Sequence, residues 1–273
     1  MKKLISLSLA LMMILGAAFC FSSCNMTVKD EAPKTPTLVC GVTPFEKMNE
    51  QDENGNWTGF ESEFAMEVGK LIGMNVDFQV IDWGQKYMEL EAGTIDCIWN
   101  GFTANSSDNG VPRSELVDFS YGYMLNQQCI VINKSNAASY KTVADLVGKT
   151  VAVESGSAGA SYATGAVGDN GKLLEFPAQN KTFLEVKTGA ADFAVVDIVL
   201  AKNICGNGDY ADLMIVEDIV LESEIYAVGF KKGSDLTEKV NAAIKTLFEN
   251  GKIMELATKY GFENVMQLTE VIE

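Results

Sequence analysis

Short apolar runs and helical spacings alternate along the first third of the chain. Runs typical of buried strands lie at 37–42, 74–81 and 95–99. Between them, apolar residues recur every three or four positions over 60–72 and 83–92, and each of these segments is followed by a glycine. This spacing predicts amphipathic helices that end at the glycine. Because strands and helices alternate, we expect a parallel sheet that helices cover on both faces.

The alternation starts again after an expected strand at 128–133. The later segments are expected to form strands at 150–153, 173–176, 191–196 and 225–230, and helices at 157–167, 180–188 and 198–204. Two further helical segments, split at Asn250-Gly251, run from 236 to 260. The restart predicts a second α/β lobe with its own doubly wound, mostly parallel sheet.

The order of the segments predicts where the chain passes between the lobes. One expected strand and the last helices follow the second series, so we expect the chain to cross near Cys129 and to return near Ala227. Lobe 1 then comprises 38–128 and 227–273, and lobe 2 comprises 129–226. Two crossing strands make a hinge, and a cleft between hinged lobes is a common ligand site.

Polar residues follow two of the expected strands, where ligands collect in α/β folds. Asn100 comes directly after one strand and is followed by Gly101, Thr103 and Arg113, while Asp197 stands at the equivalent place in the second series. Glycine lets a ligand approach the backbone, and arginine can hold a carboxylate through two parallel hydrogen bonds. These residues are candidates for binding a small zwitterion. The alternative is a surface turn whose arginine pairs with a neighbouring acid.

The first 23 residues have the character of an export signal. Two lysines precede an apolar run at 4–21, and two serines stand directly before Cys24. We therefore expect a signal peptide over 1–23 and lipidation of Cys24, followed by a polar tether over 24–37 that contains two prolines. The protein would then be extracytoplasmic, lipid-anchored to the outer face of the cell membrane or periplasmic. An uncleaved membrane anchor and a simple secretory signal are the alternatives.

Composition narrows the chemistry. The chain has 21 basic and 37 acidic side chains and no histidine. Without the signal segment the formal charge is −18, from 19 basic and 37 acidic side chains, which argues against nucleic acid as a partner. The missing histidine removes the commonest metal ligand and general base, so we expect neither a metal nor a cofactor. Four cysteines remain after residue 24, at 40, 97, 129 and 205. We expect buried thiols, and a disulfide among them stays open.

Several motifs, in order, resemble one family of proteins. They are D-E-N-G-N-W-T-G-F at 52–60, I-D-W at 81–83, G-T-I-D-C-I-W-N-G-F-T at 93–103, R-S-E-L-V-D-F-S at 113–120, D-L-V-G-K-T-V-A-V-E-S-G-S at 145–157, and G-x-x-D-x-x-x-x-D at 189–197. Together they resemble the amino-acid-binding branch of bacterial extracellular solute-binding proteins, which feed ABC importers. The resemblance covers 38–262 and implies the two-lobed periplasmic-binding-protein fold.

The resemblance also implies roles for single residues. Arg113 matches the family's carboxylate clamp, and Thr103 matches a hydroxyl that assists it. Ser157 and Ala158 fall where the family presents backbone amides at the start of a helix, which is a natural anion site. At 158 the family commonly has a hydroxyl residue, so only the backbone N–H of Ala158 can serve.

The opposite end of the ligand would meet other residues. Asp197 matches the acid that takes the α-ammonium group, together with the carbonyl of Gly101. Phe45 and Trp83 align with aromatic walls around the body of the ligand. One departure concerns the segment 104–112, which is longer than the family's usual connection and makes Asn105, Ser106 and Asp108 candidates for additional ligand or lip residues.

The resemblance implies a binding function. We expect a monomer that captures a free amino acid, with a polar one favoured, and delivers it to the permease subunits of an ABC importer. An enzyme of dehydratase or lytic type on the same fold is the second hypothesis, although no nucleophile and base pair is recognisable. A ligand-sensing subunit that reports to a receptor is the third, and the residues alone do not separate it from an importer subunit.

Overall fold

The computed structural model describes residues 34–270. The expected signal peptide, Cys24 and most of the expected tether therefore lie outside the described residues. Within the described part of the chain, no helix is both long and apolar enough to cross a membrane.

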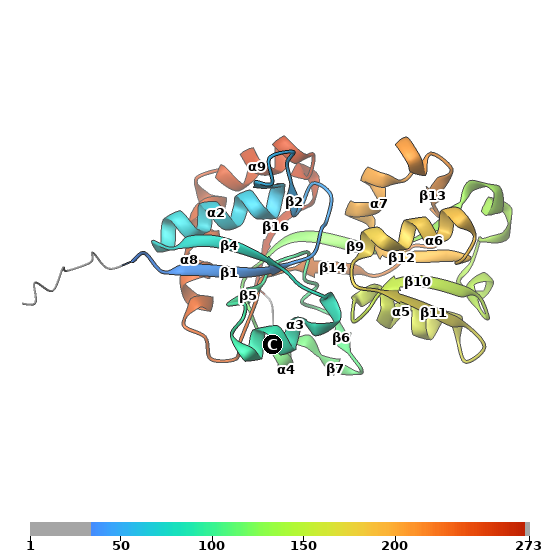
Figure 1. The fold of residues 1–273 in the computed structure, drawn as a ribbon, viewed down its shortest axis with the longest axis horizontal. Coiled ribbons are helices and arrows are strands. Elements are labelled where there is room, and N and C mark those ends of the chain that lie inside the picture. Colours follow the sequence, from blue (N-terminus) through green and yellow to red (C-terminus); the bar gives the residue numbers. More distant parts are fainter. Residues whose placement is uncertain (1–33, 271–273) are drawn as a thin grey trace, which may run out of the picture. The chain divides into compact units, whose positions relative to one another are not determined.

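The first sheet has the strand order β4-β1-β5-β15-β8 (Figure 1). β1 (Thr37–Val42) lies between β4 (Asn75–Val80) and β5 (Cys97–Ile98) and runs parallel to both. β15 (Gly229–Phe230) and β8 (Asp118–Phe119) extend the sheet with antiparallel pairings. The helices of this half of the molecule are α2 (Phe60–Ile72), α3 (Lys86–Ala92), α4 (Arg113–Leu116), α8 (Leu236–Glu249) and α9 (Lys252–Tyr260).

The second sheet has the order β11-β10-β12-β9-β13, with β14 and β16 also paired to β9. β10 (Thr150–Glu154) runs parallel to β11 (Lys172–Phe176) and β12 (Phe193–Asp197). Antiparallel pairings to β9 (Gly122–Asn133) are made by β12, β13 (Leu213–Ile215), β14 (Ser223–Tyr226) and β16 (Met266–Thr269). The helices here are α5 (Ala158–Val167), α6 (Thr182–Thr188) and α7 (Ile198–Ile204).

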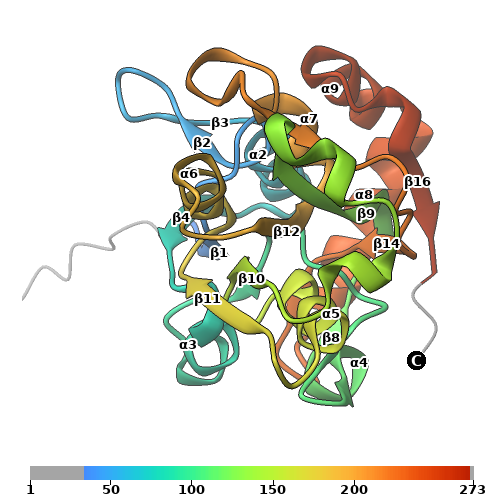
Figure 2. The same ribbon diagram turned by 90° about the vertical axis from the view of Figure 1, so that its right-hand side faces the viewer.

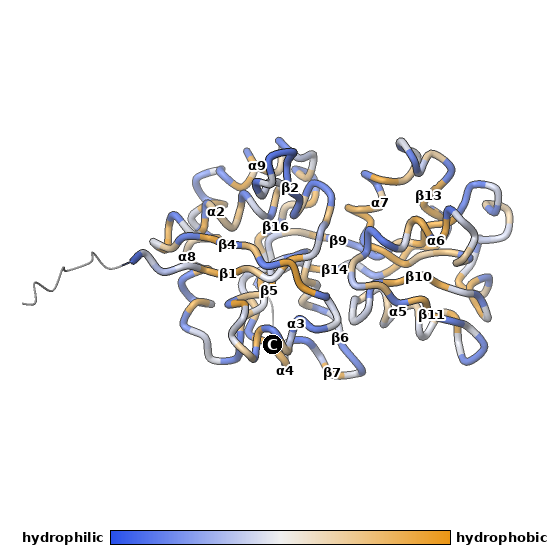
Figure 3. The backbone as a smooth tube through the Cα atoms, viewed as in Figure 1, coloured by the Kyte–Doolittle hydropathy of each residue, from blue (hydrophilic) through white to orange (hydrophobic). Residues whose placement is uncertain are grey.

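Alternate strand residues build separate cores on the two faces of the second sheet. Ala152 and Ala194 pack in a core with Phe183 of α6, whereas Val151 and Val195 pack in another core that includes α5 residues. Figure 1 shows α6 and α5 on opposite sides of these strands, and Figure 3 shows that the strands carry the most apolar stretches. Successive side chains of a strand point to opposite faces of the sheet, so an uninterrupted apolar run supplies a core on each face.

β9 belongs to the second sheet and runs from one half of the molecule to the other (Figure 1). Its first half pairs with β14, with Met124 opposite Tyr226, and its second half pairs with β12, with Cys129 opposite Val196. The two crossing strands expected from the sequence are therefore β9 and β14, which lie side by side in both views (Figure 1 and Figure 2), and the fold is two-lobed (Figure 1). The boundaries 38–128, 129–226 and 227–273 stay a prediction.

Some elements differ from the sequence expectation. The strand expected at 225–230 is two strands, because Ala227 N–H donates to Phe102 and Ser120 N–H donates to Val228 as the chain passes from one sheet to the other. The strand expected at 128–133 begins earlier, at Gly122. Two small hairpins were not expected, β2–β3 (Glu50–Gln51 and Trp57–Thr58) and β6–β7 (Ser107–Asp108 and Val111–Pro112). Short 3₁₀ helices lie at Trp83–Gln85, Lys134–Ser139, Val143–Leu146, Gln179–Lys181, Gly208–Tyr210 and Glu263–Val265.

The start of α2 depends on a glycine. Phe60 and Glu61 donate their N–H groups to the carbonyls of Lys47 and Met48, so this loop lies tightly over the start of the helix. Gly59 has φ +101°, and a Cβ atom there would lie 2.4 Å from Met48 O. Neither the backbone angle nor the space suits any other residue.

We therefore predict that Gly59→Ala lowers the free energy of unfolding by roughly 2–4 kcal/mol, through backbone strain and the clash with Met48 O. Gly55→Ala is the matched control, because Gly55 also has a positive φ, +81°, but its Cβ would meet nothing within 4 Å. Denaturant unfolding of both variants measures the difference. Equal losses of stability in the two variants would show that the clash with Met48 O contributes nothing to the loss in Gly59→Ala.

Candidate functional site

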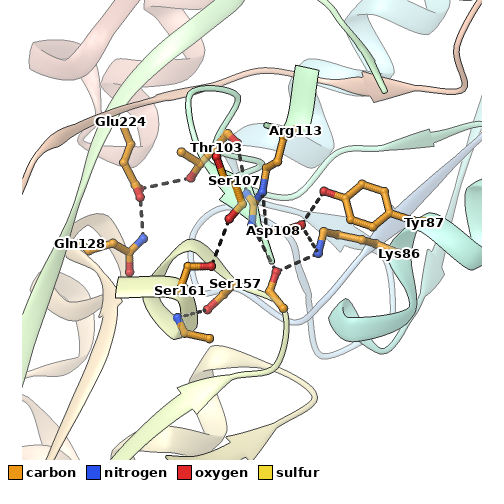
Figure 4. Close-up of polar contacts among 12 residues, drawn as sticks. Lys86, Tyr87, Thr103, Ser107, Asp108, Arg113, Gln128, Ser157, Ser161 and Glu224 are labelled. Atoms are coloured by element: carbon orange, nitrogen blue, oxygen red, sulfur yellow. Dashed lines mark hydrogen bonds and ion pairs between the residues drawn. The ribbon is translucent and has the colours of Figure 1, made fainter. Parts of the chain in front are cut away.

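Arg113 is buried at the start of α4, with 1% of its surface exposed. Its Nε and Nη2 atoms donate to Asp108 Oδ1 at 3.1 and 2.9 Å, and its Nη1 atom donates to Thr103 O at 3.1 Å. Nη2 also donates to Gly156 O at 3.2 Å, across from one lobe to the other. The structure therefore places Arg113 at the interlobe contact, beside Thr103 as expected, and adds Asp108 as its partner (Figure 4).

Asp197 ends β12 and is also buried. Three amide groups donate to its carboxylate. Gln128 Nε2 lies 2.6 Å from Oδ1, Asn126 Nδ2 donates to the same oxygen, and Gln179 Nε2 donates to Oδ2. Burial raises the pKa of Asp197 above its usual 3.8, although these amides counteract that effect. The carboxylate is thus held in place by neutral donors and lacks a cationic partner among them.

Glu224 is a second buried carboxylate at the same place, and sequence reasoning missed it. It accepts from Asn126 Nδ2 at 2.6 Å, from Gln128 Nε2 at 3.0 Å and from Thr103 Oγ1 at 3.2 Å. Burial, together with the charge of Asp197, raises its pKa to about 7. Asn126 and Gln128 therefore bridge two carboxylates. The signal in the sequence was a pair of polar side chains, Asn126 and Gln128, that stand two positions apart and therefore share one face of β9.

Two further buried acids lie near Asp197. Burial raises the pKa of Glu61 to about 7 and that of Glu154 to about 8, and in both cases the charge of Asp197 adds to the effect. Glu61 accepts the N–H of Gly101 at 2.9 and 3.0 Å, so it fixes the loop after β5. Glu154 Oε1, at the end of β10, has no hydrogen-bond partner among residues 34–270.

Lys86 is the second cation of the site and was also missed. Its side chain is 2% exposed, its Nζ atom donates to Gly156 O at 2.8 Å, and it lies 3.3 Å from Asp108 Oδ2. Burial lowers its pKa to about 8, and the charge of Arg113 contributes to the lowering. Lys86 and Arg113, both from lobe 1, thus donate to one carbonyl of lobe 2.

The expected aromatic walls lie at different places. Trp83 packs edge to face on Phe102 with a centroid distance of 5.6 Å, and the Nζ atom of Lys86 lies 5.2 Å from the Trp83 ring. Phe45 lies against Gly101, where a Cβ atom would be 3.0 Å from Phe45 Cε1 and 3.1 Å from a ring atom of Tyr226. Gly101 is thus required for this close packing.

Three more of the expected site residues lie near the contact between the lobes: Asn100, Ser157 and Ala158. The side chains of Asn100 and Ser157 form hydrogen bonds within their own lobe. The side chain of Asn100 bonds Thr43 at 2.7 and 2.9 Å and Asn49 at 2.7 Å, so it holds the loop of lobe 1. Ser157 Oγ caps α5 by accepting the N–H of Ala160 at 3.0 Å. Ala158 is the first residue of α5.

A cavity of about 580 Å³ opens beside Glu224. Its walls include Ser106, Gln128, Ala158 and Tyr162, so residues of both lobes meet there. Among the described residues that line it, two are glutamates, Glu222 and Glu224, and none is a lysine or arginine. This is an opening with an acidic wall, next to the carboxylates bridged by β9.

The comparison with known proteins identifies the family. The profile of bacterial extracellular solute-binding proteins, family 3, matches residues 38–264. The chain belongs to this family. The resemblance expected from the motifs is thereby confirmed, as is the two-lobed fold.

Similar proteins bind amino acids. The arginine-binding extracellular protein ArtP of Bacillus subtilis strain 168 is 26% identical over 89% of this chain and 92% of its own length. The structure of an ancestral arginine-binding protein bound to arginine is 30% identical, with a TM-score of 0.74, and covers 82% of this chain and 97% of its own. An ancestral amino-acid-binding protein described as a precursor of cyclohexadienyl dehydratase is 27% identical, with a TM-score of 0.71, over 82% of this chain and 95% of its own.

The buried acids predict a pH dependence of stability. Glu61, Glu154 and Glu224 have folded-state pKa values of about 7 to 8, raised from 4.5, so between pH 5 and 8 the folded state binds more protons than the unfolded state. Stability therefore falls as the pH rises through this window. Lys86 makes stability rise with pH, but only above its folded-state pKa of about 8, where the unfolded state still holds the proton.

We expect the ligand-free protein to melt higher at pH 5.5 than at pH 8, by roughly 2–6 °C. Glu154→Gln should make this slope shallower, since it removes one of the groups that take up a proton. Calorimetric melting curves across the pH range measure both slopes. A melting temperature that rises from pH 5.5 to 8 would contradict the assignment of these carboxylates.

Proposed function

We propose that the protein captures an amino acid, or a close chemical derivative of one, between its lobes and delivers it to an ABC-type import permease. The observation that carries this proposal is the pair of buried carboxylates, Asp197 and Glu224, that neutral amides of β9 hold in place. Burying a carboxylate without a countercharge costs free energy, so a cation that binds between the lobes is stabilised by these two carboxylates. The ammonium group of an amino acid supplies that charge.

The position of the pair suits ligand-driven closure. Asn126 and Gln128 belong to β9, which passes between the lobes, and Thr103, which donates to Glu224, follows β5 of lobe 1. A ligand held by groups from both sides stabilises the closed arrangement over the open one. The residues proposed to surround the ligand are Phe45, Trp83, Gly101, Ser157 and Ala158. Asn100 is proposed to support the loop beside the ligand.

The family supports the cellular setting. Its members are extracellular solute-binding proteins, and relatives such as the arginine-binding protein of Bacillus subtilis match nearly the whole chain. We therefore propose an extracytoplasmic, monomeric protein that is anchored through a lipidated Cys24. An importer subunit is proposed in preference to a sensor, because one similar structure, 30% identical, is described as an ABC uptake transporter substrate binding protein.

An enzyme is the second candidate. The observation that favours it is the likeness to an ancestral amino-acid-binding protein described as a precursor of a dehydratase, together with buried acids whose pKa values lie near neutrality. Acids of this kind can donate and accept protons at neutral pH. A turnover assay with arogenate and prephenate tests it, and product formation that is lost in Glu154→Gln would displace the binding proposal.

Asp197→Ala tests the binding site. Removing one partner of a buried charge pair costs about 2–5 kcal/mol, so the dissociation constant of the best ligand should rise by roughly 30-fold to several thousand-fold. The ligand is found first by calorimetric titration of the full-length protein in detergent, after bound solutes are removed. The twenty amino acids and their amide and amine derivatives are tested.

Asp218→Ala serves as the matched control, because Asp218 is an exposed acid whose ion pair with Lys141 lies on the surface. It should bind the ligand as tightly as the unaltered protein. If Asp197→Ala folds and also retains full affinity, the ammonium site lies elsewhere.

A further inference from the structure

The segment 104–112, longer than expected for the family, forms a defined hairpin. Ser107 pairs with Pro112 and Asp108 pairs with Val111, and the two residues between them, Asn109 and Gly110, have φ values of 52° and 80°. A two-residue Asn-Gly turn with positive φ angles suits the twist of a tight hairpin. The hairpin therefore has one preferred shape, and Asp108 has a fixed position on it.

The carboxylate of Asp108 is fully bonded by side chains of lobe 1. Oδ1 accepts from Arg113 Nε and Nη2 at 3.1 and 2.9 Å. Oδ2 accepts from the hydroxyl of Tyr87 at 2.6 Å and lies 3.3 Å from Lys86 Nζ. Burial works against the charged form, but Arg113 and Lys86 lower the pKa of Asp108, so it is ionised at neutral pH. Figure 4 shows the four side chains turned toward one another.

The hairpin is held at its base as well as through Asp108. Asn105 bonds β14 in both directions, with its Nδ2 atom 3.0 Å from Ser223 O and its Oδ1 atom 2.9 Å from Ile225 N. From the other lobe, Ser161 Oγ donates to Ser107 O at 3.1 Å. Moving the hairpin away from Arg113 would break these bonds together with those of Asp108. The carboxylate is thus part of the wall of the site.

Arg113 consequently has little left to offer a ligand. A guanidinium group has five N–H donors, and four of them go to Asp108, Thr103 O and Gly156 O. A carboxylate can be clamped through Nε and Nη2 or through Nη1 and Nη2, and both pairs need Nη2, whose two N–H groups go to Asp108 Oδ1 and Gly156 O. The chain itself supplies the anion that the carboxylate of an amino acid would otherwise bring.

The rest of the site is rich in acceptors. Asp197, Glu154 and Glu224 lie together, and Glu154 Oε1 and Asn126 Oδ1 have no partner within the described part of the chain although both are buried. The adjoining cavity adds Glu222, and no basic side chain is found among the described residues of its lining. A ligand with a net positive charge would satisfy these acceptors. A carboxylate on the ligand would be repelled by the acidic side chains of the site.

We propose that the cleft prefers a cationic amine without a free carboxylate, such as an amidated or decarboxylated amino acid or a diamine, over the corresponding zwitterionic amino acid, because Asp108 occupies Arg113. This rests on the proposed function, since it assumes that the interlobe cleft is the ligand site. Asp108 then acts as a residue that determines specificity.

The test compares ligands that differ only at the carboxyl group. Arginine, arginine amide and agmatine form one set, and ornithine and putrescine form another. Calorimetric titration of the full-length protein in detergent should show that the amide or amine binds at least tenfold more tightly than the amino acid. If the amino acid binds more tightly than its derivatives, the inference is wrong while the proposed function stands. If no member of any set binds, the inference is wrong, and the proposed function is wrong as well when none of the twenty amino acids and their derivatives binds.

Asp108→Asn should change the preference and not merely weaken binding. Without the charge on Asp108, Arg113 and Lys86 lack an anionic partner. The carboxylate of an amino acid can then take that place, so the amino acid should gain at least tenfold in affinity relative to its amide. Asp118→Asn is the matched control, because Asp118 pairs with Lys232 at 3.1 Å in the same lobe, and it should leave the preference unchanged. A folded Asp108→Asn protein with an unaltered preference would overturn the role of Asp108. The comparison on the unaltered protein holds even if this variant fails to fold.

Discussion

Negative charge buried at the crossing strand is the constraint on which the rest of the structure depends. Asp197 and Glu224 share the amide donors of Asn126 and Gln128, and those amides belong to β9, the strand that passes between the two lobes. Neutral donors reduce the cost of burying two carboxylates but do not cancel their mutual repulsion. The strand that connects the lobes therefore supplies amide donors to two buried carboxylates, and the proposed function assigns a cation to them.

The opposite end of the site shows the reverse arrangement. Arg113 and Lys86 are both buried, and the chain satisfies them internally through Asp108 and the carbonyl of Gly156. Because that carbonyl belongs to the other lobe, the two cations contribute to lobe contact without a ligand. In the proposed function, closure thus has a fixed part, made by the protein alone, and a second part that a cation bound at Asp197 completes. The second part gives the ligand its influence on closure.

The sequence predicted the fold better than it predicted the partners within the site. The period of apolar residues located nearly every helix and the parallel strands, because burial on both faces leaves a strong pattern. Asp197 and Arg113 were predicted because they follow strands within recognisable motifs. Glu224 and Lys86 were missed because their partners are distant in sequence, 96 residues from Glu224 to Gln128 and 70 from Lys86 to Gly156. Asp108 was a candidate lip residue, but no local pattern indicated that it would face Arg113.

Proton release on binding tests the central claim most directly, that a cation neutralises buried carboxylates which are partly protonated before it arrives. Titration of the best ligand at pH 7, in buffers with different enthalpies of ionisation, measures the protons exchanged. Burial holds the pKa values of Glu154 and Glu224 at about 8 and 7, and a bound cation lowers them. The account predicts the release of on the order of one proton per ligand. A binding heat that is independent of the buffer, or an uptake of protons, would contradict it.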